Sequence, residues 1–474
     1  MDYQLLPFRF EQFHEDEYLL TNEVGEYIFV NKDIFGSLIA GSLDINSDEF
    51  CNLSSKQIVT VDPIKDVIYM LATKFRTKKS ILNDFTSLHM VVPTLRCNSN
   101  CVYCQVARKN INDHSSEMSK RTAKNIVKNI FLSPSDYIKI EFQGGEPLTN
   151  FEMVKYIIET AELHNLFKKK NLEFVICTNL TLLNEKMIKY LKKHNCMIST
   201  SLDGPKDLHD QNRPLQNEAL DHHEIFESKL SLIRKIWGSQ NCISALMTSS
   251  KYSLGRFREI IDEYIRLGFN SIFLRSLNPY GFAKKHKDRV AYPIEDFVAS
   301  YKDGLDYIIE LNKKGIFFTE GFATLLLRRI LTPFATGFVD LQSPAGVGIS
   351  CAIYDYDGSV YVSDEARMMG RTKNYYFRLG NVNTNSYQEM FNGEKLHDII
   401  KSSCTECLPG CSDCVFQPYC GADPVRNMSE QGSIIGFRST NEMCIKTKAV
   451  ITYLFNLLKK NDPEINKIFW SWVR

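Results

Sequence analysis

Three cysteines with short spacing form the first candidate site. Cys97, Cys101 and Cys104 follow a short apolar run, and an aromatic residue, Tyr103, precedes the last of them. Three thiolates on a tight loop can ligate three irons of a four-iron cluster and leave the fourth iron open to an exogenous ligand. The alternatives are a zinc site, which needs a fourth ligand that is not near in the sequence, and unligated buried thiols. The spacing therefore favours an iron–sulfur cluster with one open iron.

A glycine-rich turn follows the second predicted strand and reads Gln143-Gly144-Gly145-Glu146-Pro147. Adjacent glycines allow a ligand to approach the backbone closely. A backbone carbonyl or a carboxylate at this place can accept a hydrogen bond from an ammonium group. On its own this sequence is typical of a plain turn. Its position one strand after the cysteine loop favours a ligand site formed by Gly144, Gly145 and Glu146.

Polar residues also stand where later predicted strands end. A hydroxyl or carboxylate at a strand end can bond ribose hydroxyls, a guanidinium can grip a carboxylate with two hydrogen bonds, and an apolar side chain can pack against adenine. Helix capping or a surface ion pair is the alternative for each residue singly. The candidates are Thr178, Asn179, Ser199, Ser201, Asp203, Arg213 and Leu274.

The elements that position these residues alternate between strand and helix. The predicted strands are apolar without clean alternation, as in buried parallel sheets, and they are Leu88–Pro93, Tyr137–Phe142, Leu172–Cys177, Met197–Leu202, Cys242–Met247 and Ser271–Leu274. The predicted helices are Lys120–Phe131, Phe151–Leu163, Asn184–His194, His222–Trp237, Leu254–Leu267 and Ile294–Leu311. Six strand–helix units predict an α/β fold whose parallel sheet is open or curled into a partial (β/α)6 barrel. Ligands bind at the carboxyl ends of such strands.

Two smaller regions flank this α/β core, which we expect over residues 86–320. Residues 1–85 predict an α+β module with a hairpin around residues 18–30, a helix capped by Asp33 and ended by Gly41, and another helix after Asp62-Pro63. In residues 340–474 periodicity fades, loops dominate up to Cys444, and an apolar helix closes the chain at Lys446–Leu458. Metal clusters can supply the stability that such a region lacks.

Seven further cysteines lie in this last region. Clustered cysteines outside an oxidising compartment indicate metal or catalytic sites. Cys411, Cys414, Cys420 and Cys444 can hold one metal centre, although paired spacings of this kind also suit zinc. The remaining three are Cys351, Cys404 and Cys407.

The composition excludes several classes of protein. The chain has 474 residues, 44% hydrophobic and 24% charged, which is typical of a globular protein of about three domains. Its net charge of +1 gives no sign of a nucleic-acid partner, and no apolar stretch reaches the ~18 residues of a membrane span. No secretory signal pattern is visible, so we expect a cytoplasmic location, where a disulfide framework is disfavoured for the 14 cysteines.

The cysteine loop, the Gly-Gly-Glu-Pro turn and the late cysteines together resemble the radical S-adenosylmethionine (radical SAM) superfamily with a C-terminal SPASM domain. The resemblance implies a radical SAM barrel in which Cys97, Cys101 and Cys104 hold a four-iron cluster whose open iron chelates S-adenosylmethionine. One electron from the cluster then cleaves this cofactor into methionine and a 5′-deoxyadenosyl radical. The resemblance also implies that the turn around Gly144 holds the amino group of the cofactor. It implies that a serine such as Ser201 bonds the ribose and that an arginine such as Arg213 bonds the carboxylate.

The resemblance further implies one or two auxiliary four-iron clusters in a SPASM-like region over residues 340–474. The four cysteines from 411 to 444 match the ligands of the second auxiliary cluster. For the first, Cys351 fits the family pattern, but Ser363 and Pro424 stand where relatives often have cysteines. We expect Cys351, Cys404 and Cys407 to hold this cluster with an open or non-cysteine fourth ligand. No cluster, or zinc, is the alternative.

A finer resemblance is to the B-type radical SAM maturase of the His-Xaa-Ser system. It is carried by Leu5–Phe10 with Tyr18–Gly25, by Thr94–Val106 and by Gln417–Arg426. It implies an enzyme that modifies a ribosomally made peptide or small partner protein with His-Xaa-Ser repeats. An electron donor such as flavodoxin or ferredoxin and a paired second radical SAM maturase are the other implied partners. The N-terminal module resembles elements that recognise a precursor peptide as an added strand; a packing or dimerisation domain is the alternative.

Other functions stay open at this point. Within the same superfamily the runner-up is oxidation of a serine or cysteine, as in anaerobic sulfatase maturases. Two alternatives lie outside the superfamily. One is an iron–sulfur electron-transfer protein, against which the Gly-Gly-Glu-Pro turn argues. The other is a metal-stabilised scaffold that recruits a partner enzyme.

Overall fold

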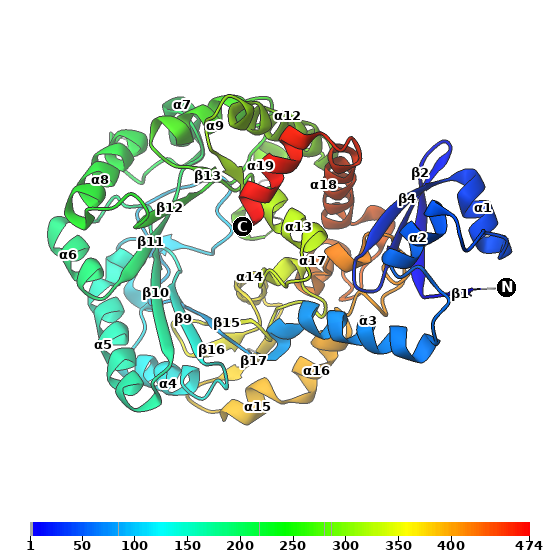
Figure 1. The fold of residues 1–474 in the computed structure, drawn as a ribbon. Helices are drawn as coiled ribbons and strands as arrows, with labels where there is room; N and C mark the ends of the chain where they lie inside the picture. Colours follow the sequence, from blue (N-terminus) through cyan, green and yellow to red (C-terminus); the bar gives the residue numbers. More distant parts are fainter. Residues whose placement is uncertain (1–2, 84, 218, 279, 286) are drawn as a thin grey trace.

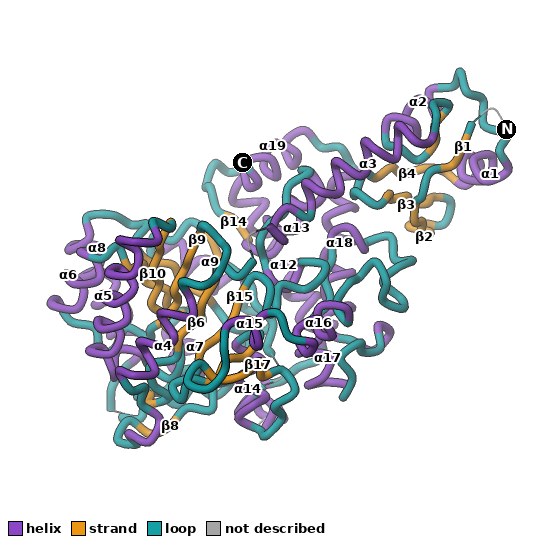
Figure 2. Tube along the Cα trace, turned by 90° about the horizontal axis from the view of Figure 1, so that it is seen from below, coloured by secondary structure: helices purple, strands orange, loops and turns teal. Residues whose placement is uncertain are grey.

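The computed structural model describes residues 3–83, 85–217, 219–278, 280–285 and 287–474. A curved sheet ringed by helices forms the larger part of the molecule (Figure 1). A small N-terminal module lies at the opposite end, and the C-terminal third of the chain fills the space between them, as Figure 2 shows from a second direction.

Five parallel strands form the core of the large sheet. They are β6 (Leu88–Val91), β9 (Tyr137–Phe142), β10 (Asn171–Cys177), β11 (Cys196–Ser201) and β12 (Ile243–Leu246), in the spatial order β12-β11-β10-β9-β6. The helices that cover the outer face are α4 (Lys120–Ile130), α5 (Phe151–Lys168), α6 (Glu185–Lys193), α7 (Lys206–Asn212), α8 (His222–Trp237) and α9 (Phe257–Arg266) (Figure 1). The α/β fold class and the alternating elements are therefore confirmed.

The sixth predicted strand differs from its prediction. The strand β13 (Ser271–Ile272) pairs with β14 (Thr319–Glu320) in a separate two-stranded sheet and not with β12. The Glu320 carboxylate accepts a hydrogen bond from the Leu274 backbone N–H at 3.0 Å, which ends the ladder after two residues. The helices α10 (Gly281–Lys285), α11 (Lys287–Val290), α12 (Ile294–Lys313) and α13 (Gly321–Leu331) follow.

The large sheet continues on the other side of β6 into the cysteine-rich region. The strand β15 (Cys351–Tyr354) pairs parallel with β6, and β16 (Ser359–Tyr361) and β17 (Arg378–Asn381) follow in antiparallel order. The barrel and the C-terminal region therefore share one eight-stranded sheet.

The C-terminal region is also more helical than its sequence predicts. It holds α14 (Asp364–Arg371), α15 (Tyr387–Phe391), α16 (Glu394–Lys401), α17 (Pro424–Gln431), α18 (Glu442–Lys459) and α19 (Pro463–Val473). The first four have 5 to 8 residues, which is one or two turns and too short to show a helical period. The prediction of loops up to Cys444 was wrong for this reason.

The N-terminal module has three antiparallel strands followed by three helices. Its elements are β1 (Gln4–Leu5), β2 (Phe8–His14), β3 (Glu17–Asn22), β4 (Tyr27–Asn31), α1 (Lys32–Ala40), α2 (Asp48–Ser55), β5 (Val59–Thr60) and α3 (Ile64–Lys78). Asn31 rather than Asp33 caps α1, because its side chain accepts from the Ile34 N–H at 2.8 Å. The left-handed Gly41 ends this helix as predicted.

The module docks on the C-terminal region through buried contacts. The Thr21 hydroxyl donates to the Val415 carbonyl at 2.7 Å, and the Tyr419 hydroxyl donates to the Gly25 carbonyl at 2.9 Å. Phe455 of α18 packs edge-on against the ring of Tyr27. In the described part of the chain, no helix combines the length and apolar character that crossing a bilayer requires.

Candidate active site

The cysteine loop is clamped between two neighbouring segments. Cys97 ends the short strand β7 (Arg96–Cys97), which pairs with β8 (Lys109–Asn110). The backbone N–H groups of Asn100 and Val102 donate to the carbonyls of Pro214 and Asn212 at 2.6 and 2.9 Å. All the cysteines of the chain are free thiols, so no disulfide competes for Cys97, Cys101 or Cys104.

The structure brings most of the predicted site residues to one cavity at the carboxyl ends of the parallel strands. We call it the outer cavity; its volume is about 360 Å3. Its lining includes all three loop cysteines. The predicted cofactor residues in the lining are Gly144, Gly145, Glu146, Thr178, Asn179, Ser199, Ser201 and Arg213. Two predicted residues, Asp203 and Leu274, are not among those that line it.

The two glycines set the distance between the turn and the cysteine loop. A Cβ atom on Gly145 would lie 2.2 Å from the Arg96 carbonyl oxygen, and one on Gly144 would lie 2.3 Å from the Thr94 carbonyl oxygen. The Gly145 N–H also donates to the Thr94 carbonyl at 3.1 Å. Only glycine allows this approach of the two backbones, and Gly144 has in addition a φ of 130°.

Glu146 is a connecting residue within the site. Its carboxylate, 1% exposed, accepts from the Leu148 N–H at 3.0 Å, the Thr178 hydroxyl at 2.8 Å and the Asn179 N–H at 2.8 Å. Burial raises the pKa of Glu146, while these hydrogen bonds oppose the shift. The carboxylate thus joins the end of β9 to the end of β10, and the ammonium contact predicted for it is already replaced by protein donors.

Asp203 lies behind the cavity and supports it from there. The Tyr103 hydroxyl donates to the Asp203 carboxylate at 2.6 Å, and the Arg213 guanidinium donates to the Tyr103 oxygen at 2.8 Å. Asp203 is fully buried and does not line the cavity, so its contact with ribose stays an untested prediction, and the structure shows it positioning Tyr103 in the cysteine loop. The sequence gives no signal for this pair, which is 100 residues apart.

Leu274 is buried near Gly304 of α12 and does not line the outer cavity, so its contact with adenine likewise stays an untested prediction. The neighbouring Arg275 lines the outer cavity, together with Gln143 and with Glu141 and Asp364, the last two of which sequence reasoning missed. Gln143 begins the glycine turn, and this adjacency is the only signal that pointed to it.

The outer cavity fits the cofactors that the sequence suggests. Three thiols of one rigid loop face one side of the cavity, and the buried Arg213 Nε has no hydrogen-bond partner within the described structure. An unpartnered guanidinium N–H suits a carboxylate ligand. Burial raises the pKa of Cys97 and Cys104, so binding of iron must release their protons.

The four late cysteines gather at one place beside the N-terminal module. The sulfur of Cys420 lies close enough to Cys444, Cys414 and Cys411 to interact with them electrostatically, and Cys444 lies in the first turn of α18. Among the described cysteines no three sulfurs lie within 4.8 Å of one another. Tetrahedral zinc, with Zn–S bonds of about 2.3 Å, holds its sulfurs closer than that. The donor set therefore fits an auxiliary iron–sulfur cluster better than a zinc site.

The cysteines predicted for a first auxiliary cluster do not come together. Cys351 is buried at the start of β15, and its sulfur contacts the Val362 carbonyl at 3.4 Å. Cys404 interacts electrostatically with Glu406, Lys79 and Cys407, and Cys351 is not among its neighbours in the described structure. Ser363 is the N-cap of α14, and its hydroxyl accepts from the Ala366 N–H at 3.2 Å. These residues do not fit a cluster held by Cys351, Cys404 and Cys407, and that prediction is corrected.

Cys351 lines a second cavity, of about 350 Å3, which we call the inner cavity. It shares Glu141, Gln143, Leu246, Arg275 and Asp364 with the outer cavity, so the two adjoin. The inward side chains of β6, Leu88 and Met90, form one wall, and residues of α13, α14, α17 and α18 form the opposite wall. A ligand in the outer cavity therefore lies next to a second cavity inside the barrel.

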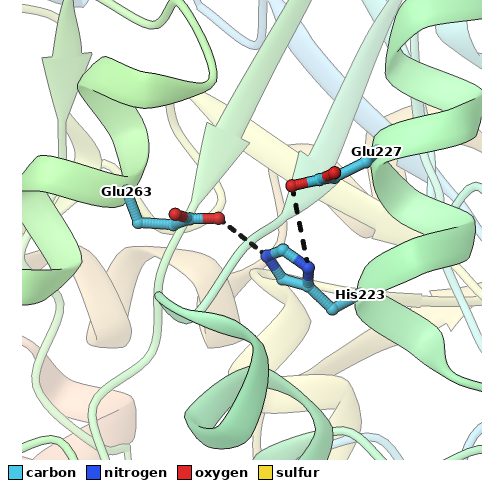
Figure 3. Close-up of side chains that lie close together, drawn as sticks. All are labelled: His223, Glu227 and Glu263. Atoms are coloured by element: carbon cyan, nitrogen blue, oxygen red, sulfur yellow. Dashed lines mark hydrogen bonds and ion pairs between the residues drawn. The ribbon is translucent and has the colours of Figure 1, made fainter.

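A further titratable cluster lies on the outer side of the barrel, between α8 and α9. Figure 3 shows the ring of His223 between the carboxylates of Glu227 and Glu263, with nitrogen–oxygen distances of 3.9 and 2.8 Å. The Arg266 guanidinium bonds both carboxylates. Because a cation of the chain already occupies the cluster, it joins the two helices and is not a free metal site.

The family comparison agrees with this geometry. Residues 91–270 match the model of the radical SAM superfamily. An uncharacterized protein of Methanocaldococcus jannaschii is 31% identical over 211 residues, which cover 44% of this chain and 68% of that protein. The chain belongs to the radical SAM superfamily. It is therefore an enzyme of a superfamily that uses a four-iron cluster and S-adenosylmethionine.

Maturases are among its relatives. The cysteine-type anaerobic sulfatase-maturating enzyme of Clostridium perfringens is 24% identical over 384 residues, which cover 76% of this chain and 93% of that enzyme. The solved structure of native anSMEcpe with bound AdoMet and Kp18Cys peptide superimposes with a TM-score of 0.65 at 21% identity, covering 80% of this chain and 99% of that one. The fold is thus that of a radical SAM maturase with its C-terminal region.

Proposed function

We propose that this chain is a radical SAM maturase that modifies a ribosomally made peptide or a small partner protein. One observation carries the proposal: the cavity that holds the three loop cysteines and the predicted cofactor residues adjoins a second cavity inside the barrel. A cavity next to the cofactor site gives a substrate side chain a place beside the reacting atoms, where contact with bulk water is reduced. The solved structure of a relative that holds both AdoMet and a peptide supports a peptide as the class of substrate.

The residues of the outer cavity divide the work of holding the cofactors. Cys97, Cys101 and Cys104 bind three irons, and the free N–H of Arg213 receives the carboxylate of S-adenosylmethionine. Ser199 and Ser201 offer hydroxyls to its ribose. When bound, the cluster and S-adenosylmethionine supply a 5′-deoxyadenosyl radical that abstracts a hydrogen atom from the substrate. Glu146 and Asp203 hold the surrounding backbone and touch neither cofactor.

The regions of the chain have separate roles in this proposal. Residues 86–320 bind the cofactors, and residues 340–474 bind one auxiliary cluster through Cys411, Cys414, Cys420 and Cys444. Residues 1–85 dock the precursor peptide. Their order of three strands and three helices leaves β2 and β4 as edge strands, to which a peptide can add. Exposed apolar side chains elsewhere in the same module, Val61, Ile64 and Ile68, support docking at this module.

The finer proposal is that the partner protein carries His-Xaa-Ser repeats, that a flavodoxin or ferredoxin supplies the electrons, and that a second radical SAM maturase works beside this one. The resemblance of Thr94–Val106 and Gln417–Arg426 supports it. The second candidate function is oxidation of a serine or cysteine. The similarity over 384 residues to a sulfatase-maturating enzyme favours that candidate.

Production of 5′-deoxyadenosine tests the proposal. The protein is reconstituted with iron and sulfide without oxygen and is mixed with dithionite and S-adenosylmethionine. We expect 5′-deoxyadenosine from the wild type and from C51A, which removes an exposed cysteine of α2, and none from C101A. If the wild type yields none, with or without a His-Xaa-Ser protein, the proposal is wrong.

Mass spectrometry of a co-expressed partner protein separates the two candidates. Oxidation of serine or cysteine to the aldehyde removes two hydrogen atoms from one residue and leaves the peptide linear. A cross-link or an epimerised residue shows a different fragmentation or digestion pattern.

A further inference from the structure

The inner cavity carries more negative than positive side chains. Five carboxylates line it, from Glu141, Asp340, Asp364, Glu365 and Asp423. Its cationic residues are Arg275, Arg426 and Lys446. The Arg426 guanidinium is bonded by the carboxylates of Glu430 and Glu442, which lie outside the lining, so its charge is already balanced. Two cations are left to face five carboxylates.

Backbone N–H groups of Val425 and Arg426 donate to Asp423 at 2.8 and 3.0 Å, but among the described residues the five carboxylates have one ion pair, between Glu365 and Arg275. Burial raises the pKa of Asp340 and of Glu365, and it raises the pKa of Asp423 to about 7, with the charge of Asp340 adding to the shift. Arg275 approaches Glu365 only to 3.8 Å. A cation that enters the cavity would stabilise the ionised forms of these groups.

A buried hydroxyl in the same wall also lacks a partner. Tyr280 is 3% exposed, and its oxygen has no hydrogen-bond partner within the described structure. Its charged neighbours are Asp423, Glu365 and Arg426, so the hydroxyl lies among the carboxylates. Buried hydroxyls in native proteins are nearly always bonded to protein, water or ligand. This second observation indicates that a polar group of a ligand belongs here.

The spacing of the carboxylates favours an organic cation over a metal ion. Among the described residues, no three of these carboxylates have oxygens within 4.8 Å of one another. A divalent metal with oxygen ligands at about 2.0–2.6 Å needs them closer. A guanidinium, or an ammonium group on a flexible stem, can bond carboxylates that are farther apart. The apolar wall formed by Leu88, Met90 and Phe273 suits the methylene groups of such a stem.

We infer that the inner cavity binds the cationic side chain of a lysine or arginine in the substrate peptide and thereby selects the residue that is placed at the cofactor. This inference rests on the proposed function, because it assigns the substrate class of the same site. The cationic head lies among Asp340, Glu365 and Asp423, and the carbon atoms nearer the peptide backbone lie toward the outer cavity.

Binding of short peptides tests the inference directly. The anaerobically reconstituted enzyme with S-adenosylmethionine is titrated with acetyl-Gly-Gly-Xaa-Gly-Gly-amide in a calorimeter, where Xaa is lysine, arginine, norleucine or glutamate. We expect the lysine or the arginine peptide to bind at least tenfold tighter than the norleucine peptide, because its cationic head forms charged hydrogen bonds with the carboxylates, and the glutamate peptide to bind weakest. Equal binding of lysine, arginine and norleucine peptides, or binding of none of them, would overturn the inference.

Variants locate the effect in the cavity. The double variant D340N/E365Q, at two carboxylates that line the inner cavity and not the outer one, should lose most of the preference for lysine over norleucine while binding the norleucine peptide as the wild type does. D303N is the matched control, since Asp303 pairs with Arg258 on the outer surface of α12. Should the double variant fail to fold, the wild-type comparison of lysine with norleucine still decides. The 5′-deoxyadenosine assay tests the proposed function separately. If the wild type cleaves S-adenosylmethionine but binds the peptides without a preference for charge, this inference is wrong and the proposed function stands.

Discussion

The variant Gly145→Ala tests how closely the glycine turn must approach the cysteine loop. The added Cβ would lie 2.2 Å from the Arg96 carbonyl oxygen and 2.4 Å from the Leu95 carbonyl oxygen, whereas such contacts are essentially never shorter than 3.0 Å. The two segments must therefore separate by about 0.8 Å, the difference between 3.0 and 2.2 Å. Both neighbours are backbone atoms, so no side chain can relieve the contact by rotating.

The separation has a cost in stability and a larger cost in activity. It weakens the hydrogen bonds from Gly145 N to Thr94 O and from Glu146 N to Arg96 O, now 3.1 and 2.7 Å, at about 0.5–1.5 kcal/mol each. Cys97 follows Arg96 directly, so the iron-binding loop moves relative to the residues proposed for S-adenosylmethionine. A misplacement of about 1 Å can reduce a rate about 100-fold.

The assay is the anaerobic rate of 5′-deoxyadenosine formation, with iron content and the melting temperature measured on the same samples. We expect G145A to keep its iron, because the three thiols remain, and to lose about 100-fold in rate. G36A is the control: Gly36 lies in α1, and nothing lies within 4 Å of an added Cβ. A wild-type rate in G145A would show that this approach of the two backbones does not set the geometry of the site.

Three further predictions concern other parts of the chain. Iron analysis of the reconstituted protein should give about eight irons per chain, from two four-iron clusters. C351A should leave this number unchanged, and C414A should lower it by about four. About twelve irons in the wild type would show that a first auxiliary cluster is present after all. Y103F leaves the buried Asp203 and Arg213 without their shared hydroxyl, so equilibrium dialysis should show S-adenosylmethionine bound about tenfold more weakly, with urea unfolding easier by about 1.5–3 kcal/mol. At Glu263, burial raises the pKa, but hydrogen bonds from Arg266 and His223 outweigh it and lower the pKa from 4.5 to about 2. The contribution of Glu263 to stability is therefore present above pH 4.5 and is lost as the pH falls to about 2. Urea unfolding of E263Q at pH 7 should be easier by roughly 2 kcal/mol, and the assignment is contradicted if E263Q loses as much stability between pH 4.5 and pH 2 as the wild type does.

Much of the barrel was predictable because its strands are buried on both faces and its helices are long. The strand Tyr137–Phe142 and the helix His222–Trp237 have the residues that the sequence predicts. The sixth strand could not be placed, because its pairing with β14 depends on the Glu320 carboxylate, 46 residues from Leu274. Short helices such as Asp364–Arg371 were not predicted because one or two turns are too few to show a helical period in the sequence.

The candidate site was predictable where one short segment carries the chemistry, as in Cys97–Cys104 and Gln143–Pro147. It was not predictable where the role of a residue depends on a distant partner. Asp203 has the right type and position for a ribose contact, but Tyr103 occupies its carboxylate. Cys351 matches a family pattern, but the fold places it in the wall of the inner cavity.

The shared sheet explains why the cofactor site and the inner cavity belong together. Five parallel strands from β12 to β6 do not close a barrel, and β15 pairs with the free side of β6, so the C-terminal region begins where the curved sheet is open. From there α14, α17 and α18 supply Asp364, Asp423 and Lys446 to the inner cavity, opposite Leu88 and Met90 of β6. The region that holds the cysteine loop thus supplies the candidate cofactor site, and the region from residue 340 on supplies most of the charged side chains of the inner cavity. Under the proposal above, exchange of Asp340 and Glu365, which line only the inner cavity, should alter peptide preference without altering the cleavage of S-adenosylmethionine in the absence of peptide.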